Sequence, residues 1–344
     1  MSQRLIARLR LFGILILACT VIGLGEFALF ADDDAWSRVS PAHIGFSWFV
    51  GSAMAYGFEI LLVPSRYGAP IRRMHFLSAI FAKSAFLVLV VILATVIGDL
   101  VFLGHLDLDF MVDPERGFAR TLLIVFALVL TLQVIIQVVR IIGAQKLLNM
   151  ILGRYRQPVA EDRIFMFLDL AGSTALAERL GDVGVQRLIT RFFFDISEPI
   201  AEYGGEIHQY VGDEVVVTWP LGAPEANVRA IRCAFAIADT VRAKSAGYAR
   251  DFDVIPAFRI GLHGGPIVIS QCGDQKQEIS YFGDTINTAS RVVDACKTYG
   301  RGLLISGDLL SRIALPDRFR STLLGTVQLR GHARETDLLG VELV

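Results

Sequence analysis

The chain has 344 residues, a positive mean hydropathy and a formal net charge of −1. A charge so close to zero gives no basis for a general affinity for nucleic acid, so we expect no nucleic-acid partner. The apolar fraction of 53% exceeds that of an ordinary soluble protein, and the excess lies almost entirely before residue 144. This asymmetry predicts an N-terminal membrane domain followed by a soluble C-terminal domain.

Long apolar segments dominate the first part of the chain. Each is close to the ~20 residues that a helix needs to cross a bilayer. There are four, over residues 11–31, 44–63, 77–103 and 118–142. We therefore predict that residues 1–143 form an all-α domain of four transmembrane helices embedded in a lipid bilayer.

The charges between these segments predict their orientation. Arginines precede the first segment and separate the second from the third, basic residues follow the fourth, and the other two connections are acidic. The positive-inside rule then places both termini and the C-terminal domain in the cytosol. The alternative is that the first segment is a cleaved signal peptide, which would leave three spans and export the C-terminal half; no clear small-x-small cleavage site supports it.

Four charged residues fall inside the first three apolar segments. Glu59 and Lys83 lie at matching depths from the cytosolic ends of the second and third segments, which predicts an intramembrane ion pair. Glu26 and Asp99 lie near the outer ends of the first and third segments. Such residues mark either a site for an unidentified membrane or periplasmic ligand or contacts between helices, and the sequence leaves both open.

Residues 144–160 are polar and basic and predict a connecting helix that continues from the fourth span. Leu147, Leu148, Ile151 and Leu152 form one apolar stripe, and Gly153 and Pro158 close the helix. We hypothesise that the spans hold two subunits together and transmit a signal through this connector.

From residue 161 onward apolar strands alternate with amphipathic helices, so residues 161–344 predict an α/β domain. The four cysteines show neither metal nor disulfide spacing, which suits a reduced cytosol. The expected order is strand 163–168, helix 173–203, hairpin 205–219, helix 224–245, strands 256–262, 265–270 and 277–282, helix 284–298, strand 302–306, helix 307–313, and strands 325–329 and 336–343.

Two carboxylates predict a metal site. Asp169 ends the first strand of this domain, and Asp213 lies at the hairpin tip, where Asp also simply suits a tight turn. If the hairpin lies beside the strand, two like charges meet, which divalent cations make tolerable. The carbonyl of Leu170 would be a further ligand. The backbone amides that open the next helix would bind a triphosphate; they belong to Ala171, Gly172, Ser173 and Thr174.

Asn287 and Arg291 are four residues apart on the predicted helix 284–298 and therefore share one face. An amide and a guanidinium presented together suit a ribose and a phosphate that develops charge. The alternative is a solvated helix face. His208 and His263 lie in or beside predicted strands, and we expect both to be structural.

Three motifs in this order resemble the class III nucleotidyl cyclases. They are Phe-x-Asp-Leu-x-Gly-Ser-Thr at 167–174, Val-Gly-Asp-Glu at 211–214 and Gly-Asp-Thr-Ile-Asn-Thr-Ala-Ser-Arg at 283–291. The resemblance covers roughly residues 161–344. It implies an α+β sandwich of the ferredoxin-like, palm type, in a bacterial, membrane-anchored member that resides in the inner membrane.

The resemblance also implies a homodimer with active sites at the subunit interface. One subunit would hold two Mg²⁺ or Mn²⁺ ions per site with Asp169 and Asp213, and the other would supply Asn287 to orient the ribose and Arg291 to stabilise the transition state. Arg330 matches the position of a phosphate-binding lysine in the family. The implied reaction is attack of the ribose 3′-hydroxyl on its own α-phosphate with loss of pyrophosphate.

The base-recognition positions depart from the family pattern. Gln209 stands where adenylate-specific members usually carry lysine, and Ser280 stands where they often carry Asp or Thr. A Gln amide donates and accepts hydrogen bonds, so it reads either purine. Ser280 favours ATP by resemblance to bacterial adenylate cyclases, and GTP, giving a guanylate cyclase, stays the alternative.

Three other functions are weaker. Val211-Gly212-Asp213-Glu214-Val215 is also similar to the hairpin signature of diguanylate cyclases, but the Gly-Gly start is missing and Asn287 with Arg291 would go unexplained. A four-span receptor with a degenerate cyclase domain is the non-enzymatic alternative, although every expected metal and transition-state position is occupied. A transporter would leave the soluble half without a role.

Overall fold

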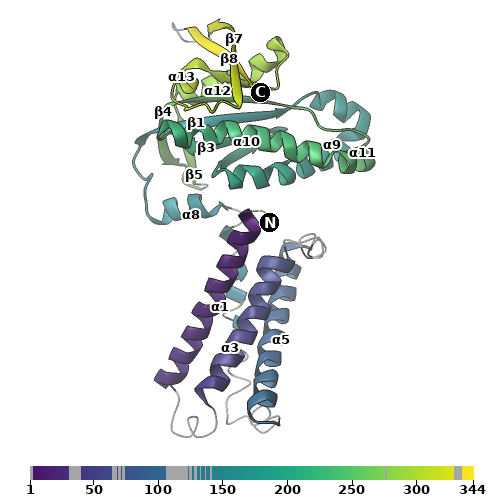
Figure 1. Cartoon of the computed structure of the whole chain (residues 1–344), viewed down its shortest axis with the longest axis vertical. Coiled ribbons are helices and arrows are strands. Elements are labelled where there is room, and N and C mark those ends of the chain that lie inside the picture. The colour runs from purple at the N-terminus through teal and green to yellow at the C-terminus, as the bar shows by residue number, and fades with distance from the viewer. Residues whose placement is uncertain are drawn as a thin grey trace. The chain divides into compact units, whose positions relative to one another are not determined.

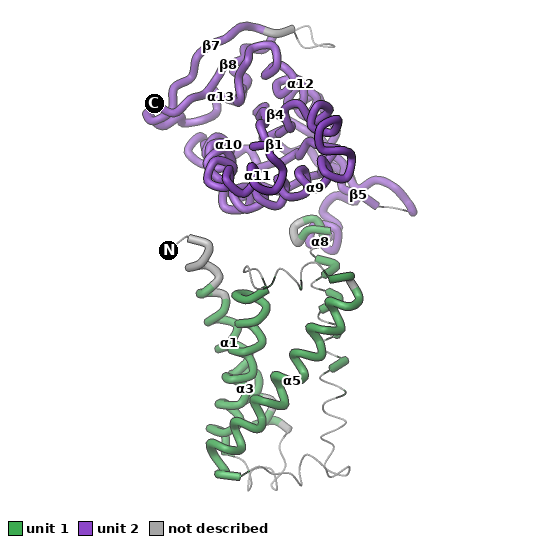
Figure 2. Tube along the Cα trace, turned by 90° about the vertical axis from the view of Figure 1, so that its right-hand side faces the viewer, with its two compact units in different colours: residues 1–147 green, residues 148–344 purple. Residues whose placement is uncertain are grey.

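In the computed structural model the chain divides into two compact units, residues 1–147 and 148–344 (Figure 2). The structure describes residues 3–30, 40–63, 74–105, 142–275, 277–328 and 335–344, together with isolated positions at 68, 71 and between 123 and 139. We describe each unit by itself.

The N-terminal unit consists of long apolar helices (Figure 1). They are α1 (Gln3–Phe30), α3 (Pro41–Tyr56), the π-helix η1 (Gly57–Leu62) that continues from α3, and α5 (Phe76–Phe102). Among the described residues three stretches are long and apolar enough to cross a membrane, Phe12–Leu29, Pro41–Leu62 and Leu77–Phe102. They coincide with the first three predicted spans, whereas the fourth, 118–142, lies largely outside the described residues.

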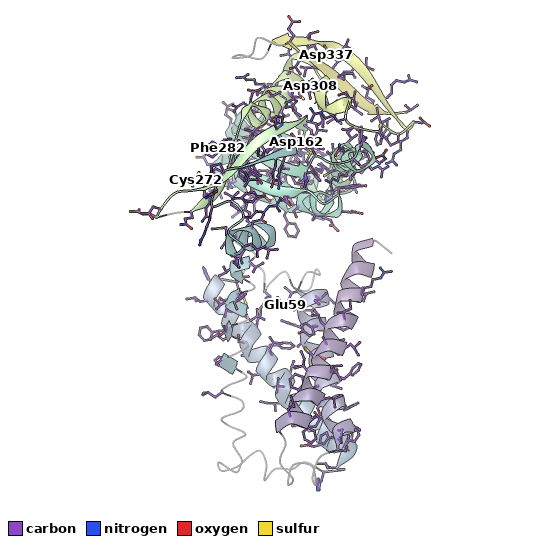
Figure 3. All side chains as sticks on the ribbon, turned by 90° about the vertical axis from the view of Figure 1, so that its left-hand side faces the viewer. Glu59, Asp162, Cys272, Phe282, Asp308 and Asp337 are labelled. Atoms are coloured by element: carbon purple, nitrogen blue, oxygen red, sulfur yellow. The ribbon has the colours of Figure 1, made fainter. Side chains whose placement is uncertain are left out.

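The predicted ion pair between Glu59 and Lys83 is confirmed. The Lys83 ammonium donates to both carboxylate oxygens of Glu59, at 2.7 and 3.0 Å, and Lys83 is only 7% exposed. Glu59 comes from η1 and is labelled in Figure 3. Asp99, near the other end of α5, pairs with His43 of α3 at 3.2 Å between Oδ1 and Nε2, a contact that the sequence did not predict.

Helix α8 (Ala144–Ile151) crosses the boundary between the two units, which falls between Leu147 and Leu148. The prediction that this helix runs on unbroken from the preceding span is wrong, because Gly143 has a φ of +91°, which a right-handed helix does not permit. The following connector residues belong to the folded domain: Tyr155 is 3% exposed, and its carbonyl accepts a hydrogen bond from the Gln271 amide at 2.7 Å. The predicted connector therefore ends inside the first strand, which starts at Val159.

A mixed sheet of eight strands organises this unit and confirms the α/β prediction. The strand order is β2-β3-β1-β4-β6-β8-β7, with β5 paired to the outer part of β4. Only β4 and β6 run parallel to each other, and the other neighbours are antiparallel. The elements are β1 (Val159–Leu170), α9 (Ser173–Glu202), β2 (Glu206–Val211), β3 (Glu214–Pro220), α10 (Pro224–Ala243), α11 (Ser245–Phe252), β4 (Phe258–Cys272), β5 (Glu278–Phe282), α12 (Asp284–Tyr299), β6 (Leu303–Ser306), α13 (Gly307–Leu310), β7 (Phe319–Gln328) and β8 (Glu335–Leu343).

Both faces of the central strand β1 are buried, which explains its nearly continuous apolar sequence. Ile164, Met166 and Leu168 point to the face that α9 and α10 cover. Phe165 and Phe167 point to the opposite face, where α12 packs. The sheet thus holds the residues at the ends of its strands in fixed positions.

The predicted break between strands 256–262 and 265–270 is wrong, because β4 runs through it. Gly264 and Gly265 lie at this point of the strand and let neighbours approach: a Cβ on Gly265 would lie 2.9 Å from the Thr285 hydroxyl oxygen. Gly261 is still tighter, since a Cβ there would lie 2.3 Å from the backbone nitrogen of Val293. The glycines of β4 therefore seat α12 directly on the strand.

Replacing Gly261 by Ala should force α12 away from β4 and destabilise the domain by about 1–3 kcal/mol. For a domain of this size each kcal/mol lowers the midpoint of thermal unfolding by about 2–4 °C. The full chain in detergent serves for the measurement. Gly302→Ala is the matched control, because a Cβ at Gly302 has no atom within 4 Å; equal midpoints for the two variants would contradict this account.

Replacing Lys83 by Met should leave the Glu59 carboxylate without its ammonium partner among apolar helices. Removing one member of a buried ion pair costs about 3–5 kcal/mol. The double variant Glu59→Gln with Lys83→Met removes both charges and should recover most of that loss. Thermal unfolding of the full chain in detergent gives the comparison, and a double variant as unstable as the sum of the two single ones would show that the pair does not couple.

Candidate active site

Two acidic residues meet at one edge of the sheet. Asp169 is the penultimate residue of β1 and pairs in register with Glu214 of β3, while Asp213 occupies the tight turn between β2 and β3. Gly212, with a φ of +62°, supplies the left-handed backbone of that turn. Burial and the neighbouring Asp213 carboxylate raise the pKa of Asp169. The predicted encounter of the two side chains is therefore present within one chain.

Glu214 adds a third negative charge to this edge. Burial, followed by repulsion from Asp169, Asp294 and Asp213, raises the pKa of Glu214 to about 7. In the part of the chain that the structure describes, no three His, Cys, Asp or Glu side chains form a metal-binding group. Oxygen donors for a divalent cation are nevertheless at hand: the carboxylates of Asp169 and Asp213 and the Leu170 carbonyl could hold one, and the repulsion between the two carboxylates would favour it.

The helix that follows β1 starts as predicted, with one difference. Gly172 is the N-cap residue of α9 in the left-handed region, with a φ of +74°. The Ala171 amide already donates to the Ala257 carbonyl at 2.8 Å, so it is not open to a phosphate in this arrangement. The amides of Gly172, Ser173 and Thr174 remain at the helix start, where helical geometry leaves the first N–H groups without a carbonyl partner.

Arg259 belongs to this edge and was missed by the sequence reasoning. It lies opposite Asp169 in the β1–β4 ladder, and its Nη1 is 3.7 Å from the Asp169 Oδ2. The same Nη1 is buried and has no hydrogen-bond acceptor among the described residues. The only signal in the sequence is its place at the start of a strand, and its nearness to Asp169 follows from the register of two strands about 90 residues apart.

Asn287 and Arg291 share one face of α12, as predicted, but they do not reach Asp169 in the same chain. Lys297 is the residue of α12 whose charge acts on Asp169. At a rise of 1.5 Å per residue, Asn287 lies about 15 Å and Arg291 about 9 Å farther along the helix axis. Asn287 is exposed, and the Arg291 Nη1 is buried with no hydrogen-bond partner in the described part of the chain.

Gln209 and Ser280 lie on β2 and β5, which are not neighbours in the sheet. The residues beside them meet: the rings of His208 and Tyr281 are 4.3 Å apart between centroids. His263 is buried, and its Nδ1 lies 2.7 Å from the Ser306 Oγ, an environment that agrees with the predicted structural role. Arg330 lies outside the described residues.

Comparison with known proteins identifies the domain. Residues 157–339 match the family described as "Adenylate and Guanylate cyclase catalytic domain". The chain therefore belongs to the class III adenylate and guanylate cyclase family, whose members use divalent metal ions.

Two curated relatives come from Rhizobium meliloti (strain 1021). "Adenylate cyclase 2" is 40% identical over 207 residues, which is 60% of this chain and 57% of the relative. "Adenylate cyclase 1" is 32% identical over 184 residues, 51% of this chain and 27% of the relative. The chain thus spans about half or less of the length of these relatives.

Among solved structures, that of a bacterial light-regulated adenylyl cyclase is similar in fold. Its TM-score is 0.52 at 21% identity, and the match covers 61% of this chain and 62% of that one. At this identity the likeness supports the fold alone.

Glu214 predicts a pH dependence of stability in the metal-free protein. Its pKa of about 7 in the folded chain exceeds the ordinary value of 4.5, so the folded state binds the extra proton between these values. Stability should therefore fall as the pH rises through this window. In EDTA, the thermal unfolding midpoint of the wild type should fall more steeply between about pH 4.5 and 7 than that of Glu214→Gln; parallel profiles would contradict the prediction.

Proposed function

We propose that this chain is a membrane-bound adenylate cyclase, which converts ATP to 3′,5′-cyclic AMP and pyrophosphate. The observation that carries the proposal is the edge where Asp169 and Asp213 meet with Arg259 beside them, within a domain of the cyclase family. Similarity to a relative described as an adenylate cyclase supports ATP as the substrate.

The proposed active site is shared between two copies of the chain. Asn287 and Arg291 are too far along α12 to act on a nucleotide held at Asp169 of the same chain, so a second copy would supply them. Large apolar side chains on the strands that border the site support an interface: Val211 and Phe282 are 52% and 51% exposed. The catalytic domain would then have the ferredoxin-like, palm-type fold that its resemblance to the cyclase family implies.

The chain's own residues have distinct tasks in this proposal. The carboxylates of Asp169 and Asp213 would hold Mg²⁺ or Mn²⁺, and the bound ions would lower the pKa of the 3′-hydroxyl and neutralise the phosphates. The open amides of α9 and the Arg259 guanidinium would bind phosphate oxygens. From the second copy, Asn287 would orient the ribose, and Arg291 would stabilise the charge that develops as the α-phosphate is attacked.

A guanylate cyclase is the second candidate, because the proposed base-reading pair is Gln209 and Ser280. The Gln209 amide presents either a donor or an acceptor to a purine edge, according to its rotation. Both side chains are neutral, so discrimination would rest on hydrogen-bond geometry alone.

The apolar half would anchor the enzyme in a bacterial inner membrane. Residues 118–142 would form a fourth span beside the three candidate helices, and the basic residues flanking them would keep both termini and the catalytic domain in the cytosol. The buried His43–Asp99 pair and the Glu59–Lys83 pair would be the polar contacts through which these helices respond to a ligand.

The substrate is tested on the purified full chain with Mn²⁺ and either ATP or GTP, with the product identified by chromatography and mass. Cyclic AMP is the expected product. Cyclic GMP as the main product would select the second candidate. If a proven dimer makes neither cyclic AMP nor cyclic GMP, the enzymatic function is rejected and a degenerate receptor is favoured.

The shared site is tested by mixing variants. Asp169→Ala and Arg291→Ala should each lose at least about 100-fold in turnover, because each removes charge stabilisation that the reaction needs. Co-expressed, the two variants should regain activity, since one interface of the heterodimer carries both intact halves. A heterodimer that is proven by pull-down with two tags, yet stays inactive, would reject a site shared between chains.

A further inference from the structure

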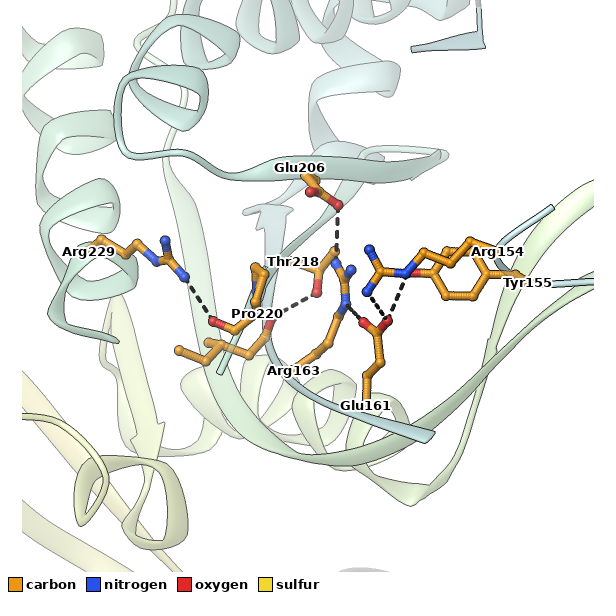
Figure 4. Close-up of polar contacts among 9 residues, drawn as sticks. Arg154, Tyr155, Glu161, Arg163, Glu206, Thr218, Pro220 and Arg229 are labelled. Atoms are coloured by element: carbon orange, nitrogen blue, oxygen red, sulfur yellow. Dashed lines mark hydrogen bonds and ion pairs between the residues drawn. The ribbon is translucent and has the colours of Figure 1, made fainter. Parts of the chain in front are cut away.

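A buried arginine lies at the start of β1, far along the strand from the catalytic edge. Arg163 is 5% exposed and is held by two carboxylates: its Nε donates to Glu161 and its Nη1 donates to Glu206, each at 3.1 Å (Figure 4). Glu206 begins β2, so the arginine ties the first strand to the edge of the sheet. None of the functions proposed above uses this cluster.

The free face of the guanidinium lies against an aromatic ring. The Arg163 Cζ is 5.6 Å from the centroid of Tyr281, a distance at which a cation is attracted by the π-face. Tyr281 also contacts the Phe165 ring edge-on at 5.7 Å and the His208 ring at 4.3 Å. The arginine therefore packs against a stack of two rings, in which Tyr281 of β5 contacts His208 of β2.

This stack is a direct contact between two strands that are not neighbours in the sheet. The register between β2 and β3 shifts between Ile207 and Gln209, so His208 is the extra residue of a β-bulge. On the other side, β5 has only five residues and pairs only with the outer end of β4, near Cys272 and Phe282 (Figure 3). The ladders join β2 to β5 only through β3, β1 and β4, whereas the ring contact joins the two strands directly.

The two residues proposed to read the base lie directly beside the two rings. Gln209 follows His208, and Ser280 precedes Tyr281. We propose that Arg163 is a positioning residue for purine recognition: by holding Tyr281 against His208, it sets the separation of Gln209 and Ser280. This inference rests on the proposed cyclase function and adds to it a determinant of base specificity that does not touch the nucleotide.

The same cluster reaches the connector that precedes the domain. Arg163 bonds to the Oε2 of Glu161, and the other carboxylate oxygen, Oε1, accepts hydrogen bonds from the Arg154 guanidinium at 2.9 Å and the Tyr155 hydroxyl at 3.0 Å. Glu161 is thus shared between the connector and Arg163.

The test measures steady-state kinetics of the full chain with Mn²⁺, for ATP and for GTP. Arg163→Met should raise the KM for ATP about tenfold and change kcat by less than about threefold, because ground-state binding of the base is loosened while the transition-state groups stay in place. The preference for ATP over GTP, as the ratio of the two kcat/KM values, should move about tenfold toward unity. A purely structural role would lower kcat/KM for ATP and kcat/KM for GTP by the same factor and leave their ratio unchanged.

Arg229→Met is the matched control. The Arg229 Nη2 donates to the carbonyl of Pro220, at 2.8 Å, and Pro220 is the residue that pairs with Arg163 in the β1–β3 ladder (Figure 4). Its loss removes a guanidinium from the same end of the sheet without touching the ring stack, so KM and base preference should stay at wild-type values.

Variants of the ring test the same contact from the other side if Arg163→Met folds poorly. Tyr281→Leu should reproduce the rise in KM, Tyr281→Phe should raise KM far less because it keeps the ring, and Arg163→Met with Tyr281→Leu should be no worse than either alone. If the wild type is active but Tyr281→Leu leaves KM and base preference unchanged, the inference about Arg163 is wrong while the proposed function stands. A wild type that makes no cyclic nucleotide would overturn the proposed function and this inference with it.

Discussion

The repulsion between the carboxylates of Asp169 and Asp213 is the constraint on which the site depends. In water two such groups would move apart, but here the backbone denies them that freedom. β1 pairs with β3 on one side and with β4 on the other over most of its length, so Asp169 cannot withdraw from the hairpin tip. The folding energy of the sheet thus maintains a local excess of negative charge, which a bound cation would relieve. Arg259 offsets only part of it, since its guanidinium lies at 3.7 Å without a hydrogen bond to the carboxylate.

The same sheet also keeps the two halves of the chemistry apart. Gly261 and Gly265 let α12 lie directly on β4, and this close packing fixes where Asn287 and Arg291 are presented. A longer or looser contact would let the helix slide toward the acidic edge, whereas a helix seated on glycines has one position. If the active site is shared as proposed, the packing of α12 on β4 is what leaves each chain's site incomplete, and assembly of two copies would complete it.

Much of this arrangement was predictable from the sequence because it depends on local patterns. Asp169 before a Gly-Ser-Thr turn, Gly212-Asp213 between apolar runs, and Asn287 four residues before Arg291 each encode their own geometry. Arg259 and Arg163 were not predictable, since their roles follow from which strands pair and in what register. The continuity of β4 through Gly264-Gly265 was not predictable for a related reason: a neighbouring helix that needs close approach gives Gly265 its place within the strand.

Gly143 interrupts the helical backbone between the apolar half of the chain and the catalytic half. A helix passes on torque only while its backbone stays right-handed, and the φ of +91° at Gly143 ends that continuity before α8 begins. A break of this kind would limit how far a rotation of the apolar helices reaches the cyclase domain. If the apolar half lies in a bilayer, as proposed, anchoring alone would hold copies of the chain at a high effective concentration. The proposed membrane anchor would then favour the meeting of the two halves of a shared site.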